Sequence, residues 1–184
     1  MHISLINRTP YGDNFCFTLM AEPWLRGPIA GMPALVMPAA HALMQAAENI
    51  PMAVRGLTTA QLWALPGGAA AVGFHLRHLA GSIDRLLTYG RGEMLSDAQM
   101  ETLDAEIDDD GRDAEQLARD AVAAIERAIE VMRVTPPGTY LEARGVGRRR
   151  LPTTVLGLLV HTAEHTQRHV GGIIATAKVV RVGA

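Results

Sequence analysis

The chain of 184 residues has few of the features that cross-link a protein or favour a β-sheet. It contains a single cysteine, Cys16, which excludes an internal disulfide and fits a reducing compartment. Aromatic residues make up only 4% of the sequence, and the net charge is −2. A chain with this charge has no electrostatic reason to bind nucleic acid or an anionic membrane. Alanine, leucine and methionine are plentiful instead, which favours helices over strands.

The sequence also lacks a hydrophobic run typical of a signal peptide or a membrane anchor. The first residues, MHISLINRTPYGDNFC, have no basic region followed by an apolar core, so we expect a cytoplasmic protein. Residues 27–47 carry no charged side chain, but Pro28, Pro33 and Pro38 interrupt them. We interpret this stretch as a loop followed by a buried or interface helix rather than as a membrane span.

Apolar residues recur at helical period in several long segments, and the sequence therefore predicts an all-α fold. We expect a single domain, 1–184, built as a four-helix bundle with short extra helices in its connectors, preceded by an irregular segment, 1–30. The long helices are predicted at about 33–49, 70–89, 112–134 and 153–180.

The connectors carry their own local signals. Thr58 with Gln61, and Ser96 with Gln99, form capping boxes that predict two short helices. We predict that residues 139–152 form a basic connector and that Thr153 caps the last long helix.

Three histidines of the last predicted helix share one face. His161, His165 and His169 follow one another in steps of four, and each step turns a helix by about 400°, so neighbours differ by about 40°. Two imidazoles one turn apart can bind one metal ion, as in helical His-x-x-x-His zinc sites. A lone histidine of this kind is more often an ordinary polar residue at a packed boundary, but three in phase favour a metal site.

A second pair of histidines, His75 and His78, lies in the predicted helix 70–89. Both are candidates for the third ligand. The amphipathic phase of the helix favours His75, because His78 lies about 60° further from the apolar stripe.

Other charged motifs give weaker signals. Residues 108–110 are three aspartates whose spacing does not fit a calcium loop, and we interpret them as a solvated loop. Residues 148–150 are three arginines without aromatic neighbours, which indicates a surface cluster rather than a nucleic-acid site. Glu164 lies on the histidine helix but about 60° off the stripe, so no general base stands out.

The chain resembles the DinB-like superfamily, a group of four-helix, metal-binding proteins. The likeness is carried by AVGFHLRHLAGSIDRLLTYGRG, by LLVHTAEHTQRHVGG, and by the approach to the second long helix from Trp63 to Gly68; it extends over about residues 30–180. The resemblance implies that the metal triad falls on His78, His165 and His169, because His78-Leu79-Ala80 matches the family's second helix. His75 and His161 would then line the pocket or contact the ligands.

One position departs from the family pattern. The family often has glutamine three residues after the last histidine, where this chain has Gly172, and we expect the missing side chain to enlarge the site.

The resemblance also implies a function. A divalent ion would activate a water or a low-molecular-weight thiol. The ion would be zinc or nickel first, with iron as a further option. The protein would then be a hydrolase or a thiol S-transferase that acts on a small-molecule substrate. The alternative is a non-catalytic metal-binding stress-response protein.

The uncharged helical surface of residues 27–47 and 66–76 further predicts a homodimer, and nothing in the sequence indicates a nucleic-acid or membrane partner.

Overall fold

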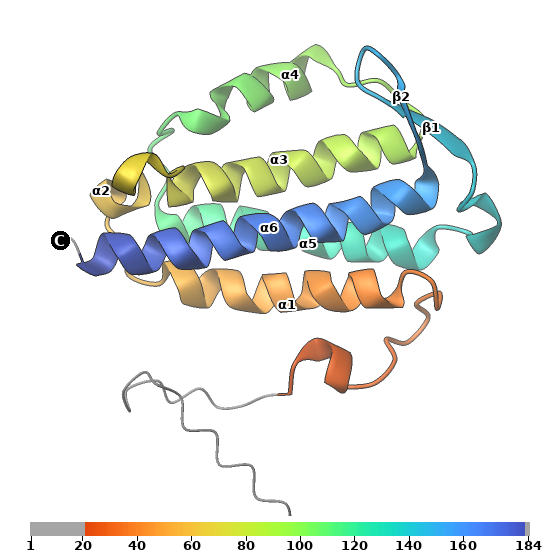
Figure 1. Cartoon of the computed structure of the whole chain (residues 1–184), viewed down its shortest axis with the longest axis horizontal. Coiled ribbons are helices and arrows are strands. Elements are labelled where there is room, and N and C mark those ends of the chain that lie inside the picture. The colour runs from red at the N-terminus through yellow and green to blue at the C-terminus, as the bar shows by residue number, and fades with distance from the viewer. Residues whose placement is uncertain (1–20, 183–184) are drawn as a thin grey trace, which may run out of the picture.

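The computed structural model describes residues 21–182, which fold mainly into helices (Figure 1). Four long helices run side by side: α1 (Met37–Val54), α3 (Val72–Gly90), α5 (Ala114–Val134) and α6 (Val155–Val182). Both α1 and α3 pack against α5 and α6. The prediction of a mainly helical protein is confirmed. Cys16 and most of the segment expected to be irregular lie outside the described residues.

Short elements occupy the connectors between the long helices. They are α2 (Thr59–Leu62), α4 (Asp97–Asp104) and the 3-10 turns at Pro66–Gly68, Ala105–Ile107 and Pro137–Thr139, while a further 3-10 turn at Pro23–Leu25 precedes α1. Both predicted capping boxes are present, at the start of α2 and at the start of α4. A third box, not predicted from the sequence, joins Asp113 and Gln116 at the start of α5.

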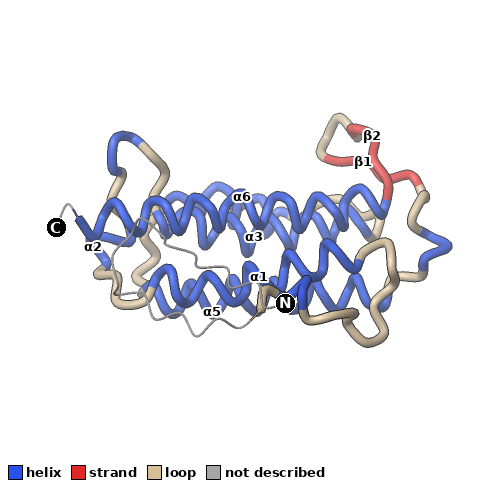
Figure 2. The backbone as a smooth tube through the Cα atoms, turned by 60° about the horizontal axis from the view of Figure 1, so that its bottom comes forward, coloured by secondary structure: helices blue, strands red, loops and turns tan. Residues whose placement is uncertain are grey.

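A small β-hairpin is the main correction to the all-α prediction (Figure 2). Strands β1 (Ala143–Val146) and β2 (Leu151–Thr154) pair antiparallel where a basic connector, 139–152, and the first residues of the last helix were expected. Gly147 and Arg150 adopt φ values of +67° and +47° in the turn between them. Strands of four residues are too short for an alternating pattern to reveal them.

Two helix boundaries also differ from the predicted ones. Helix α1 begins at Met37 rather than near Pro33 and continues through Pro51. Ile50 and Val54, on either side of this proline, are fully buried, and their packing offsets the backbone hydrogen bond that proline removes. Helix α6 begins after Thr154, whose Oγ1 accepts a hydrogen bond from the backbone N–H of Gly157, so Thr154 caps the helix instead of Thr153.

The core orients the helix that carries the second histidine pair. Leu76, Leu79 and Ile83 of α3 are buried and recur one turn apart. His75 and His78 precede Leu76 and Leu79 by one residue, or about 100° of helix rotation, and both are partly buried beside this stripe. Within residues 21–182 no helix combines the length and hydrophobicity needed to cross a membrane.

Candidate metal centre

Three histidines from two helices converge between α3 and α6. His78 comes from α3, and His165 and His169 come from successive turns of α6, which lies beside α3 (Figure 1). One ring nitrogen from each of the three lies within 4.8 Å of those from the other two. The Nε2 atoms of His78 and His165 are 3.1 Å apart. Three nitrogen donors this close can hold one metal ion.

All three imidazoles are partly buried, and their rings lie against one another. The ring centroids of His165 and His169 are 4.5 Å apart, and the His78 centroid is 5.2 Å and 4.6 Å from them. The Phe74 ring stacks on His78 with a centroid distance of 5.3 Å and an interplanar angle of 19°. An aromatic side chain therefore covers one side of the cluster.

His75 contacts the cluster without belonging to it. Its Nδ1 lies 2.9 Å from the Nδ1 of His169, so one of these two nitrogens donates a hydrogen bond to the other. This contact leaves the Nε2 of His169 as the atom that can bind an ion. The structure thus places His78 in the cluster and His75 behind it, the reverse of what amphipathic phase alone favoured.

The space beside Gly172 is filled, contrary to the expectation that it would enlarge the site. A Cβ atom at this position would lie 2.7 Å from the Nε2 of His75. The His75 ring therefore occupies the volume that a side chain at position 172 would need. The glycine allows His75 to approach His169.

His161 lies at the outer end of the histidine stripe. Its side chain is 49% exposed, and its Nδ1 is 3.0 Å from a carboxylate oxygen of Glu164. Glu164 also pairs with Arg168 on the surface of α6. His161 therefore contributes no nitrogen to the three-histidine cluster, although its ring centroid lies 5.5 Å from that of His165.

One acidic residue at the site, Glu106, was not predicted from the sequence. It lies in the 3-10 turn after α4, and its side chain is 1% exposed. Its Oε2 is 2.7 Å from the Nδ1 of His78, and its Oε1 accepts a hydrogen bond of 2.6 Å from Arg85. No periodic pattern marks a single glutamate in a turn, and only the tertiary contact with α3 reveals it.

The electrostatics of the cluster favour neutral imidazoles. Burial, together with the nearby His78 ring, lowers the pKa of His165 to about 4 and that of His169 to about 3. Burial raises the pKa of Glu106, but hydrogen bonds from His78 and Arg85 offset this effect, so that its pKa lies below the usual value. At neutral pH the imidazoles of His165 and His169 are therefore uncharged, and the nearby carboxylate of Glu106 is ionised.

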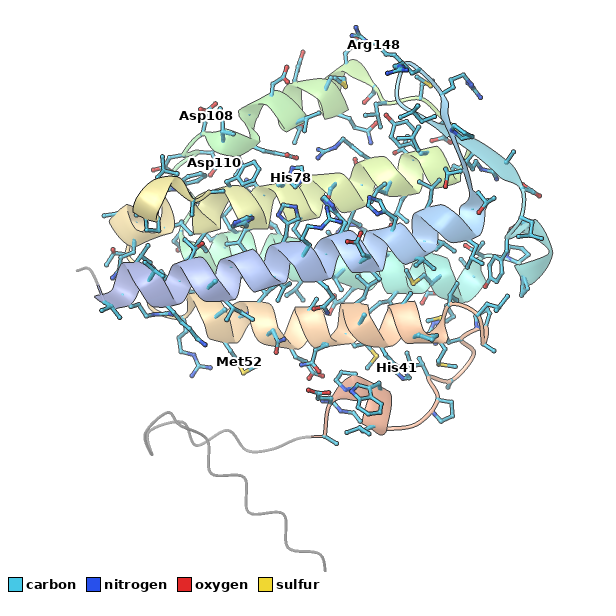
Figure 3. The ribbon with its side chains drawn as sticks, in the orientation of Figure 1. His41, Met52, His78, Asp108, Asp110 and Arg148 are labelled. Atoms are coloured by element: carbon cyan, nitrogen blue, oxygen red, sulfur yellow. The ribbon has the colours of Figure 1, made fainter. Side chains whose placement is uncertain are left out.

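The charged motifs lie around the cluster rather than in it. Asp108 and Asp110 are in the connector that leads from α4, on the same side of α3 as His78 (Figure 3). The aspartates form a loop, as expected, and Arg77 of α3 holds this loop against the helix. Its guanidinium donates a hydrogen bond to the Asp108 backbone carbonyl and pairs with the Asp110 carboxylate. Arg148 lies at the tip of the hairpin and is exposed, as expected for a surface cluster (Figure 3).

These features define a class, namely mainly helical proteins with a histidine cluster between two long helices. The family model of the DinB superfamily matches residues 42–173, and the chain belongs to this superfamily. The matched region contains all five histidines of the two sequence motifs. A comparison with curated proteins gave no significant match.

Proposed function

We propose that this protein is a metal-dependent enzyme with the four-helix bundle of the DinB-like type, and that His78, His165 and His169 hold its divalent ion. The observation that carries the proposal is the convergence of three ring nitrogens, one from each histidine, within 4.8 Å. Zinc and nickel suit an all-imidazole site best, and iron is also compatible with it.

The donor set fits such an ion. With metal–nitrogen bonds of about 2.0–2.1 Å, two ligands of a tetrahedral site lie about 3.3 Å apart. The observed distance of 3.1 Å between the Nε2 atoms of His78 and His165 is close to this value. His78 faces the cluster with Nε2 because its Nδ1 is bound to Glu106.

Three protein ligands leave at least one coordination position for a small molecule. A divalent ion held in this way lowers the pKa of a water or a low-molecular-weight thiol that binds to it. The protein holds the three nitrogens in place and covers one side of the cluster with Phe74. We therefore propose a hydrolase or a thiol S-transferase that acts on a small-molecule substrate.

Metal analysis of the purified protein tests the centre. We expect one divalent ion per chain in the wild type and none in a His165→Ala, His169→Ala double variant that keeps its helical circular dichroism spectrum. Full metal content in the double variant would refute the site. A panel of thiol-transfer and ester-hydrolysis substrates, assayed with and without chelator, then tests catalysis.

A second candidate is a non-catalytic metal-binding stress-response protein. One observation favours it: neither acidic residue near the histidines faces the cluster as a general base. Glu106 is bound behind His78, and Glu164 pairs with groups on the surface. Stoichiometric metal without chelator-sensitive turnover of any substrate in the panel would support this alternative.

We further propose a homodimer located in the cytoplasm. The support for the dimer is the uncharged surface of residues 27–47 and 66–76, where Leu35 is 66% exposed. Sedimentation at micromolar concentration should give about twice the chain mass of 19.7 kDa. A species with the mass of one chain would refute the dimer.

A further inference from the structure

The carboxylate of Glu106 contacts the histidine cluster from behind, and we propose that Glu106 is a positioning residue that fixes the tautomer and the orientation of His78. This inference deepens the proposed function, because an ion at the cluster would require His78 to present an unprotonated Nε2. The connector that carries Glu106 lies over α3, on the side where His78 is found (Figure 3).

The hydrogen bond determines which ring nitrogen carries the proton. The Oε2 of Glu106 lies 2.7 Å from the Nδ1 of His78, and an ionised carboxylate can only accept. Nδ1 therefore carries the proton, and Nε2 keeps its lone pair directed toward His165, 3.1 Å away. Because Glu106 binds the ring on the side opposite Nε2, it acts through His78 and does not contact a molecule bound at the cluster.

Arg85 holds the carboxylate in this position. Both side chains are largely buried, with exposed fractions of 9% for Arg85 and 1% for Glu106. The guanidinium lies 2.6 Å from one carboxylate oxygen and 3.4 Å from the other, so each oxygen of Glu106 has a partner. A buried carboxylate without partners would be strongly unfavourable, and the pairing therefore stabilises Glu106 in an orientation that reaches His78.

The surface of α3 is shaped to admit Glu106. A Cβ atom at Gly81 would overlap with the Oε1 of Glu106 and would lie 2.7 Å from the Nη1 of Arg85. Gly81 lies in the interior of a long helix, where glycine costs about 1 kcal/mol relative to alanine. The close approach of the acid explains why a glycine stands there.

Two substitutions test the role of Glu106, with zinc affinity measured by chelator competition. Glu106→Gln keeps the size of the side chain and removes its charge. Gly81→Ala keeps the acid but displaces it, while alanine favours the helix. We expect either change to weaken zinc binding about 10- to 100-fold, the usual effect of losing a partner of a ligating histidine. Gly90→Ala is the matched control in the same helix, because no atom lies within 4 Å of a Cβ there, and its zinc affinity should not change.

A double-mutant cycle separates positioning from a merely structural role. If Glu106 acts through His78, Glu106→Gln should cause no further loss of zinc affinity in a His78→Ala background. An equal loss in both backgrounds would overturn the inference. Wild-type zinc affinity in both Glu106→Gln and Gly81→Ala would overturn it as well.

The metal-free protein provides a readout that does not depend on the ion. The ¹⁵N shifts of the His78 ring should show protonated Nδ1 in the wild type and a mixture of tautomers in Glu106→Gln. Protonated Nδ1 in a wild-type protein that binds no zinc would overturn the proposed function but support the role of Glu106. A tautomer mixture in the wild type would overturn that role.

Discussion

The two halves of the histidine cluster differ in what holds their imidazoles. On the α3 side, His78 is bound to a buried carboxylate that is itself paired with Arg85. On the α6 side, His169 contacts another imidazole, that of His75, and the Nδ1 of His165 has no hydrogen-bond partner among residues 21–182. The α3 half is thus supported by the ion pair of Glu106 and Arg85, and the α6 half by the contact between two imidazole rings.

This difference follows from how each half is built. His165 and His169 are one turn apart on a single helix, and the backbone of α6 already places their rings side by side. His78 is the single contribution of α3, and Phe74, the neighbour on its own helix that stacks on its ring, offers no hydrogen bond to the ring nitrogens. A ligand that stands alone on its helix therefore needs a partner from elsewhere in the fold, and Glu106 meets that need.

Removal of the α3 ligand should have the largest effect on metal binding. We expect His78→Ala to lower zinc affinity by more than about a hundredfold, a loss greater than that from any supporting residue. His75→Ala should lower it by about tenfold or less, because His75 contacts a ligand without belonging to the cluster. Zinc titration against a competing chelator measures both. The reverse order of effects would show that His75 is the third ligand.

Acid should destabilise the metal-free protein through the α6 half. His165 and His169 have folded-state pKa values of about 4 and 3, and near 6.5 when unfolded, so the unfolded chain binds more protons below pH 6.5. Their contribution to stability is therefore complete above pH 6.5 and declines as the pH falls toward the folded-state pKa values, about 4 for His165 and about 3 for His169. After discounting for solvent screening, we expect a loss of about 2 kcal/mol between pH 7.5 and 5.

Urea unfolding in the presence of chelator measures this pH dependence. The His165→Ala, His169→Ala double variant is the control and should lose less stability over the same range. An equal loss in the wild type and the double variant would show that other groups cause the decline.

A smaller effect should follow from crowding His75. In Gly172→Ala the new methyl group would lie 2.7 Å from the Nε2 of His75, which must move away from His169. We expect zinc affinity to fall about two- to tenfold, less than for loss of the charged partner on the α3 side. Gly171→Ala is the control, since a Cβ there meets no atom within 4 Å. Equal affinities for the two alanine variants would mean that the contact between His75 and His169 does not support the centre.

No measurable effect should follow from changes at the hairpin tip. Arg148 is exposed and far from His78 (Figure 3), and any electrostatic influence on the cluster is screened by solvent. Zinc affinity of Arg148→Ser should stay within about twofold of the wild type at physiological ionic strength. A larger change would show that the hairpin contributes to the site.

The long helices and the α6 pair could be predicted because their signals are local. Apolar residues at helical period identify α3 and α5, and the spacing of four between His165 and His169 places both rings on one face whatever α6 packs against. The hairpin at Ala143–Thr154 escaped prediction because its strands are too short to show a period. The boundary of α1 was misjudged at Pro51, where burial of Ile50 and Val54 overrides the local preference of proline.

The sequence by itself therefore determined the mainly helical fold, the superfamily resemblance and the histidine stripe of α6, since each depends on residues close together in the chain. The resemblance pointed to His78 where helical phase favoured His75, and the tertiary structure places His78 in the cluster. Only the tertiary structure decided that His75 packs against Gly172 and that Glu106 and Arg85 support the α3 side. The physical reason is that these contacts join different elements. The rotation of α3 against α6, and the path of the connector over α3, follow from packing of the whole chain and not from the period of any one segment.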